Sequence, residues 1–220
     1  MFKGNFLILL GLMMSVLSGC NDAESEKILI KPEATNAMIY RSNHVTVENF
    51  DSFKPIAAKF WAPKGTKNIA LGKIVSASEE YCSCGELSNI TDGKKNDSIN
   101  GYVEMAPGLQ WIQIDLEQQY DIYAIMVWHN FESYRVYKDV IIQLSNDKNF
   151  GDFVTVFNND HDNTASQLGL GPGDGKNYYE NKYGKFIDTK AMKARYVRLY
   201  SNGNYHSIYN HYIEVEVYGI

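Results

Sequence analysis

The stretch that decides the fold is KARYVRLYSNGNYHSIYNHYIEVEVYG, residues 193–219. In its last part Ile213, Val215 and Val217 alternate with tyrosines and glutamates, so we expect one face on a core and the other in water. Residues 194–200 alternate in the same way. The stretch predicts two antiparallel strands joined by a polar, aromatic loop. Loops of this composition on a rigid sheet are where binding sites tend to lie.

Short apolar runs separated by turn-forming residues continue beyond residue 68. Residues 122–128 are apolar on both sides, which indicates a central strand covered on both faces, whereas 111–116 alternates. No segment of respectable length has the period of a helix. The pattern predicts an all-β fold, an antiparallel β-sandwich of jelly-roll type. Its expected strands lie at 69–77, 111–116, 122–129, 140–145, 153–157, 184–188, 194–200 and 212–218.

The first twenty residues predict export from the cytoplasm. Lys3 precedes an apolar run at 6–16 that is too short to span a bilayer comfortably. The following Leu-Ser-Gly-Cys at 17–20 resembles the lipobox of bacterial lipoproteins, in which cleavage precedes the cysteine and its sulfur carries lipid. We therefore expect residues 1–19 to be a signal peptide and Cys20 to be a membrane anchor. An ordinary secretory signal with an incidental cysteine is the alternative.

The segments between the anchor and the sandwich are expected to lack a regular pattern. Residues 20–27 are polar and acidic and predict a flexible tether. An acidic stretch at this place also resembles a surface-export signal of some bacterial lipoproteins, with a plain spacer as the alternative. Residues 28–67, with three prolines and scattered aromatic residues, predict an extended arm that packs on the domain at 68–220. The expected location is the bacterial cell envelope, lipid-anchored and facing the periplasm or the cell surface.

The net charge limits the classes of partner that the chain can bind, and the cysteine content limits its possible disulfide bridges and metal sites. The formal net charge is −5 and no cluster of lysine and arginine is present, which argues against a nucleic-acid partner. Two cysteines remain after the anchor, Cys82 and Cys84. A bridge between residues so close in sequence would be strained. Free thiols are the second interpretation, and a metal site built on two sulfurs without nearby histidines is the least favoured.

Five sequence blocks follow one another in the chain: NIALGKIVSAS at 68–78, ITDG at 90–93, QWIQIDL at 110–116, ARYVRLY at 194–200 and EVEVYG at 214–219. In this order they resemble the blocks of the discoidin domain, also called the coagulation factor five/eight type C domain. The resemblance covers most of the chain after the arm and implies a galactose-binding-like jelly roll. Bacterial members of this family are mostly carbohydrate-binding modules, whereas members in animals can bind phospholipid or protein.

The loop TDGKKNDS at 91–98 is rich in the oxygen ligands that calcium prefers. The resemblance implies one structural calcium ion held by Asp92, Asp97, Ser98 and Glu214. The family usually has a threonine and a tryptophan soon after this loop, where this chain has Gly-Tyr-Val-Glu at 101–104. An ordinary turn aspartate and a solvated strand glutamate are the alternatives for Asp92 and Glu214.

A sugar site needs a flat ring for stacking and planar groups that bind neighbouring hydroxyls. Three loops offer them, at 128–135, 158–163 and 204–211. The alternatives are that Trp128 belongs to the core, that Arg135 pairs with Glu132, and that 158–163 is a second calcium loop or a plain hydrogen-bonded turn. The glycine-rich segment 167–179 is expected to border the same end. The predicted ligand contacts are His129, Arg135, Asp160, His161 and Tyr205.

Three classes of function are compatible with this sequence. The favoured one is a non-catalytic, membrane-anchored module that binds a glycan or polysaccharide. The second is a glycan-active enzyme, for which Asp160 and Asp162 are the candidate carboxylate pair, although no apolar pocket to raise one pKa is evident and no hydrolase motif is present. The third is a protein-interaction subunit of a cell-envelope complex, docked through the arm.

Overall fold

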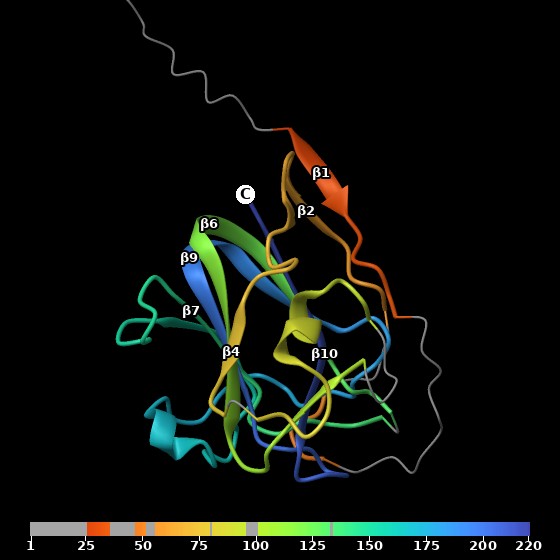
Figure 1. The fold of residues 1–220 in the computed structure, drawn as a ribbon, viewed down its shortest axis with the longest axis vertical. Coiled ribbons are helices and arrows are strands. Elements are labelled where there is room, and N and C mark those ends of the chain that lie inside the picture. Colours follow the sequence, from red (N-terminus) through yellow and green to blue (C-terminus); the bar gives the residue numbers. More distant parts are fainter. Residues whose placement is uncertain (1–25, 36–46, 52–55, 80, 96–100, 133) are drawn as a thin grey trace, which may run out of the picture.

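The computed structural model describes residues 26–35, 47–51, 56–79, 81–95, 101–132 and 134–220 (Figure 1). The predicted signal peptide, the lipid anchor Cys20 and the two calcium ligands Asp97 and Ser98 lie outside these residues.

Strands dominate the described chain, and no α-helix occurs in it. Two short 3₁₀ helices, η1 (Leu87–Thr91) and η2 (Ser166–Leu168), are the only helical turns among the described residues, and none is long and apolar enough to cross a membrane. The strands are β1 (Lys27–Ile30), β2 (Phe60–Pro63), β3 (Lys67–Asn68), β4 (Val75–Ala77), β5 (Val103–Met105), β6 (Gln110–His129), β7 (Ile141–Ser145), β8 (Val154–Asn158), β9 (Lys185–Ser201) and β10 (Asn210–Gly219).

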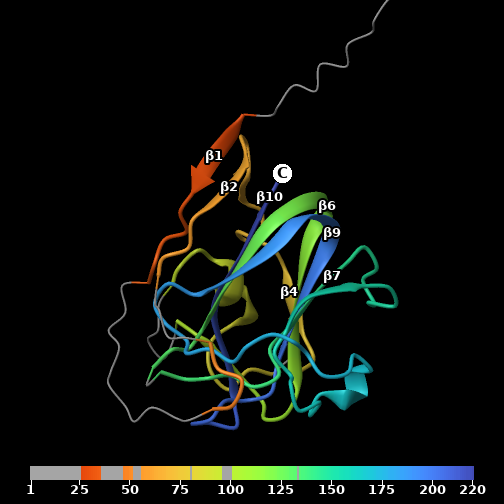
Figure 2. The same ribbon diagram turned by 180° about the vertical axis from the view of Figure 1, so that it is seen from behind.

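The main sheet follows the order β3-β10-β6-β9-β7-β8, with β4 beside β6 and β5 beside β10, and its pairs are antiparallel. β6 and β9 are long strands (Figures 1 and 2). The first half of β6 pairs with β4 and its second half with β10, and β9 pairs along both halves, so these two strands run through both layers of the sandwich. Residues expected to form separate strands, at 111–116 and 122–129, are therefore two halves of β6. The pairing slips between Asp115 and Tyr120, where Glu117 has a φ of 72°, and this irregularity lets one strand serve both layers.

The core between the layers is built from the alternating apolar residues of these strands. Ile112 and Ile114 of β6 and Val215 and Val217 of β10 are buried in one cluster. This arrangement confirms the predicted all-β, antiparallel sandwich. Cys82 and Cys84 are both thiols in the structure.

β10 differs from its prediction. All ten of its residues are buried, including Glu214 and Glu216, so it is not a surface strand with its charges in water. The register shifts between Tyr212 and Glu214. Because of this shift, the Ile213 side chain packs in a second apolar cluster, separate from the cluster that contains Val215. The pattern of alternation identified the strand, but it contained no information on the segments that cover the second face.

Residues 26–35 and 56–63 supply part of that cover. β1 pairs with β2, and Ile30, Ala58 and Phe60 pack against the second apolar cluster. The Phe60 ring lies 5.4 Å from that of Tyr218 in β10, edge to face. Aromatic pairs of this geometry add about 1 kcal/mol beyond area burial. The domain boundaries at residues 27 and 67 stay predictions.

Candidate binding site

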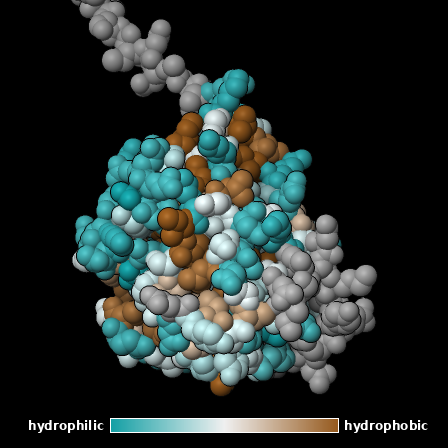
Figure 3. Space-filling view, viewed as in Figure 1, coloured by the Kyte–Doolittle hydropathy of each residue, from teal (hydrophilic) through white to brown (hydrophobic). Residues whose placement is uncertain are grey.

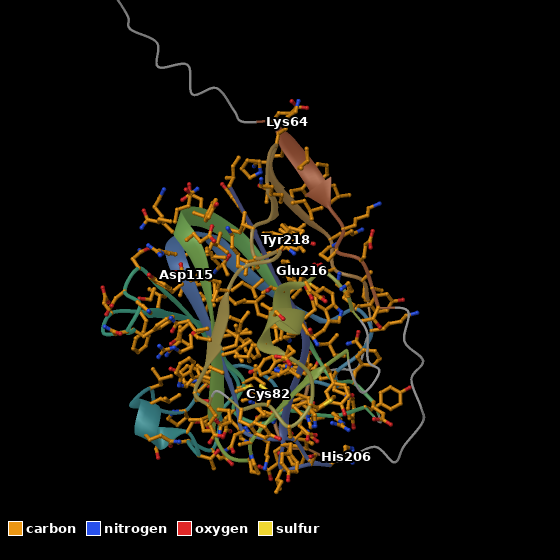
Figure 4. All side chains as sticks on the ribbon, in the orientation of Figure 1. Lys64, Cys82, Asp115, His206, Glu216 and Tyr218 are labelled. Atoms are coloured by element: carbon orange, nitrogen blue, oxygen red, sulfur yellow. The ribbon has the colours of Figure 1, made fainter. Side chains whose placement is uncertain are left out.

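A polar pocket of about 160 Å³ lies where three loops meet. The loops precede β7, follow β8 and connect β9 with β10, and each follows or precedes a strand of the rigid sheet. Figure 4 places His206, the neighbour of Tyr205, at this end of the molecule. The pocket is lined by Lys138, Asp139, Asn159, His161, Asp162, Thr164, Asn177, Asn202 and Tyr205.

Two of the predicted ligand contacts line this pocket, His161 and Tyr205. Tyr205 is 42% exposed, so its ring can be reached from solvent. Its loop is held in place because Asn204 Oδ1 accepts hydrogen bonds from the amides of His206 (3.0 Å) and Ser207 (2.9 Å). The Tyr205 amide donates to the carbonyl of Val136 at 3.2 Å. The ring is therefore presented by a fixed backbone.

Hydrogen-bond acceptors crowd one wall of the pocket. Carboxylate oxygens of Asp139, Asp160 and Asp162 lie within 4.8 Å of one another. The Thr164 hydroxyl lies 2.9 Å from both Asp139 oxygens and 3.0 Å from Asp162 Oδ1, but it has one proton to donate. Burial raises the pKa of Asp139, and the charges of Asp160 and Asp162 raise it further. This wall accepts more hydrogen bonds than its own donors supply.

Asp160 lies beneath the pocket rather than in its lining. It is 2% exposed and accepts from the amides of Thr164 (2.9 Å) and Ala165 (3.0 Å). These bonds close the loop after β8. In the structure Asp160 therefore positions the loop that carries His161 and Asp162, instead of meeting a ligand directly as expected.

Arg135 belongs to a second polar cluster next to the end of β10. Its Nη1 donates toward His211 Nδ1 at 3.2 Å, and His211 Nε2 lies 3.0 Å from Glu104 Oε2. Burial, followed by the charge of Arg135, lowers the pKa of His211 to about 4. Arg135 also lies 3.6 Å from Glu132, and its side chain is 16% exposed. The structure thus contains the Arg135–Glu132 pair named as an alternative, and Arg135 does not line the pocket.

His129 is placed in the interior, which corrects its assignment as a ligand contact. It is fully buried at the end of β6, where its ring stacks on Tyr137 at 4.4 Å and its Nδ1 lies 2.6 Å from Glu180 Oε1. No ligand can reach this ring in the structure. Glu180 is equally buried and lies 51 residues away along the chain, so the sequence contained no signal for the pairing.

The predicted calcium loop faces β10. The Gly93 amide donates to both oxygens of Glu214 at 3.2 Å, and Asp92 Oδ1 accepts from the Lys94 amide at 2.8 Å. Burial, followed by the charge of Glu216, raises the pKa of Glu214 to about 8. The ordinary-turn alternative for Asp92 is thus present, whereas Glu214 is not a solvated residue. Among the described residues, the Gly93 amide is the only hydrogen-bond donor to the buried Glu214 carboxylate, and a carboxylate in this environment fits a cation ligand.

Lys95 and Trp128 complete this region. The Lys95 ammonium lies 2.6 Å from Glu216 Oε1 and 4.7 Å from the centre of the Trp128 ring. Trp128 is fully buried and its indole donates to the carbonyl of Lys182 at 3.1 Å. Trp128 is therefore a core residue, as its alternative interpretation held, and not a platform for a sugar.

Sequence reasoning missed three of the residues that line the pocket. Lys138, Asp139 and Thr164 were not singled out, because they lie just outside the loops 128–135 and 158–163 that were considered from the sequence. Asp139 has a φ of 52° in the loop before β7, a backbone feature that the sequence does not reveal.

The antiparallel sandwich, with a polar pocket between the loops at one end, is a jelly roll of the galactose-binding-like type. The model of the F5/8 type C domain matches residues 74–215, which is more than half of the chain. The chain belongs to the F5/8 type C domain family. No curated protein matches it.

Several solved structures are similar to this chain. A family 89 glycoside hydrolase from Clostridium perfringens has 20% sequence identity and a TM-score of 0.51, covering 69% of this chain and 14% of the hydrolase. Chitosan-binding module 1 of a chitosanase/glucanase from Paenibacillus sp. IK-5 has 26% identity, a TM-score of 0.48, and coverage of 70% and 99%. A pectin-binding carbohydrate-binding module has 18% identity, a TM-score of 0.49, and coverage of 67% and 91%.

Proposed function

We propose that this chain is a non-catalytic glycan-binding module, anchored by lipid on Cys20 in the bacterial cell envelope. The polar pocket at the loop end is its contact site. The observation that carries this proposal is the placement of an exposed ring, Tyr205, beside a wall of carboxylates with unused acceptor capacity. Family membership supports it, since the bacterial members that this sequence resembles are mostly carbohydrate-binding modules.

The chemistry of the pocket suits sugar hydroxyls. Each hydroxyl donates one proton, and Asp139 and Asp162 need more donors than Thr164 and Asn202 provide. Lys138 and the Asn202 amide are donors for sugar oxygens on the same rim. The Tyr205 ring offers a flat surface to the C–H groups of a pyranose. Together these groups bind a sugar ring at its face and at its edge.

The burial of one of the two candidate catalytic carboxylates favours a binding role without catalysis. Of the pair named for an enzyme, Asp160 is buried and holds two backbone amides. Such a group lacks the access to water and substrate that a general acid or base needs.

We also propose a structural calcium ion at Asp92, Asp97, Ser98 and Glu214. The buried Glu214 carboxylate and the nearby Asp92 carboxylate support this assignment, because a bound cation would offset the cost of burying negative charge there. The ion would stabilise the loop and take no part in glycan contact.

Replacing Tyr205 with alanine is expected to weaken glycan binding about tenfold, because the stacking surface is lost. Affinity electrophoresis against a panel of polysaccharides, followed by calorimetry with the best ligand, measures this change. Tyr205→Phe should retain most of the affinity, since the ring stays. Asp162→Asn should weaken binding as well, because an amide accepts fewer hydrogen bonds than a carboxylate.

Tyr209→Ala is the matched control, since Tyr209 is 39% exposed in the same loop but does not line the pocket. Equal losses for Tyr205→Ala and Tyr209→Ala would contradict the proposed site. Failure to bind any polysaccharide, together with a tight protein partner in a pull-down, would favour an assembly subunit instead. Release of reducing sugar by the pure protein would contradict the non-catalytic role.

A further inference from the structure

The β1–β2 pair has two chemically different faces. Leu29 lies opposite Trp61 in the register, so the two side chains share one face. Lys27 and Lys31 flank Leu29 at alternate positions, and Lys59 stands two residues before Trp61, so these lysines continue the same face. The other face consists of Ile28, Ile30, Phe60 and Ala62, which are less exposed.

The outward face combines exposed apolar groups with positive charge. Trp61 is 66% exposed and Leu29 is 38% exposed. Lys27, Lys31 and Lys59 are exposed, and none of them forms an ion pair with another described residue. This face carries three lysines, with Glu33 as the next exposed residue along the same alternation, on a chain whose formal net charge is −5.

A groove of about 380 Å³ extends the apolar part of this face. Trp61, Tyr123 and Phe186 are among its lining residues, together with one acidic and one basic side chain, Asp188 and Lys190. Tryptophan and tyrosine are enriched at membrane–water interfaces, where the ring lies among the headgroups and its polar atom meets water. Lysine adds attraction to anionic lipids. The composition of the face therefore matches a lipid headgroup surface.

The position of this face adds to the argument. β1 and β2 lie at one pole of the molecule, where the described chain begins at residue 26, and the C-terminus lies nearby (Figures 1 and 2). Figure 4 labels Lys64 at this pole and His206 at the opposite one. In Figure 3 hydrophobic and hydrophilic residues lie side by side at the same pole. Lys27 is the seventh residue after Cys20, which gives a reach of at most about 25 Å.

We propose that the outward face of β1–β2, consisting of Lys27, Leu29, Lys31, Lys59 and Trp61, docks on an anionic lipid bilayer. The proposal rests on the proposed lipid anchor at Cys20, which would hold this pole within reach of the headgroups. Docking would orient the molecule so that the pocket with Tyr205 faces away from the membrane. The anchor alone limits the distance between the domain and the membrane, whereas docking of this face would also set the orientation of the domain.

The test uses the mature chain from Cys20 to Ile220 without acyl groups, so that binding reports the protein surface alone. Co-sedimentation is measured with vesicles of phosphatidylcholine, with and without phosphatidylglycerol. We expect binding only where phosphatidylglycerol is present, with a loss of about fivefold for each of Lys27→Gln, Lys31→Gln and Lys59→Gln. Lys148→Gln, an exposed lysine in the turn between β7 and β8, is the matched control and should bind as the parent chain does.

Tryptophan fluorescence gives a second measurement that needs no altered charge. Insertion of Trp61 should shift the emission to the blue on anionic vesicles. Trp61→Phe should abolish the shift, since Trp128 is already buried and Trp111 packs against a separate apolar cluster with Ile141 and Tyr200. Equal sedimentation with both vesicle types, an unchanged shift in Trp61→Phe, or capture of a protein partner by this face instead of lipid would overturn the proposal. Failure of the anchor itself is detected separately, by the mass of the chain isolated from its cells.

Discussion

Glu180→Ala is expected to lower the melting temperature by about 10 °C, through a loss of about 3 kcal/mol in the free energy of unfolding. Glu180 and His129 are buried together, and Glu180 Oε1 is the acceptor nearest to His129 Nδ1, at 2.6 Å. Truncating the glutamate leaves a buried ring nitrogen without a partner. It also opens a cavity, which adds to the loss.

The loss of stability in Glu180→Ala should extend to residues beyond the Glu180–His129 pair. Glu180 follows Asn177 and Tyr179, which contact the described residues of the arm at 47–51 through backbone hydrogen bonds and the Phe50 ring. Glu180→Ala is therefore expected to loosen the arm as well, and hydrogen exchange at the Asp51 amide, which donates to the Asn177 carbonyl at 2.8 Å, should rise. Thermal melting followed by circular dichroism measures the main effect.

Glu180→Gln separates the two contributions. A glutamine keeps the shape and an acceptor for His129 Nδ1 but removes the charge. If the pair acts as a neutral hydrogen bond, Glu180→Gln costs much less than Glu180→Ala. If it acts as an ion pair, the two variants are similarly unstable. A melting point for Glu180→Ala equal to that of the parent chain would contradict the placement of this pair in the core.

Glu214→Gln is expected to stabilise the metal-free protein at neutral pH by about 3 kcal/mol at most. Burial, and then the charge of Glu216, raises the pKa of Glu214 to about 8 from its ordinary value of 4.5. Well below pH 4.5 the Glu214 carboxyl is protonated in both the folded and the unfolded state, so its ionisation does not lower the free energy of unfolding. Between pH 4.5 and 8 the unfolded state loses its proton first, so stability falls as the pH rises.

The measurement is the melting temperature from pH 5 to pH 8 in a chelator. The parent chain should lose stability across this range, and Glu214→Gln should lose less. Added calcium should raise the melting temperature of the parent chain by mass action and that of Glu214→Gln far less. If calcium raises the melting temperature of both proteins equally, Glu214 is not a calcium ligand. If calcium leaves the melting temperature of the parent chain unchanged, the proposed calcium site is contradicted.

The elements that the sequence predicted best are the long alternating strands. Residues 194–200 and 212–218 were expected as strands and lie in β9 and β10. Alternation with period two depends only on the geometry of an extended chain, so it survives any tertiary arrangement. The same argument could not show that 111–116 and 122–129 form a single strand. That union depends on a local irregularity near Glu117, for which alternation contains no signal.

The site was predicted at the level of loops but not of all side chains. The loops containing His161 and Tyr205 do meet at one pocket, because both follow strands of the same sheet. His129 and Arg135 were expected beside them, yet both turn toward buried partners, Glu180 and His211. A polar residue at a strand end can turn either way. Which way it turns depends on partners far away in the sequence.

The sequence by itself determined that the chain folds as an antiparallel sandwich of the F5/8 type C family, since strand periodicity and block order are local properties. Only the tertiary structure decided which polar residues are reachable. Burial of Glu214 and Glu216 follows from segments that pack over β10, among them the arm and the loop containing Lys95. Exposure is a property of the packed neighbours of a residue, and alternation along one strand cannot specify those neighbours.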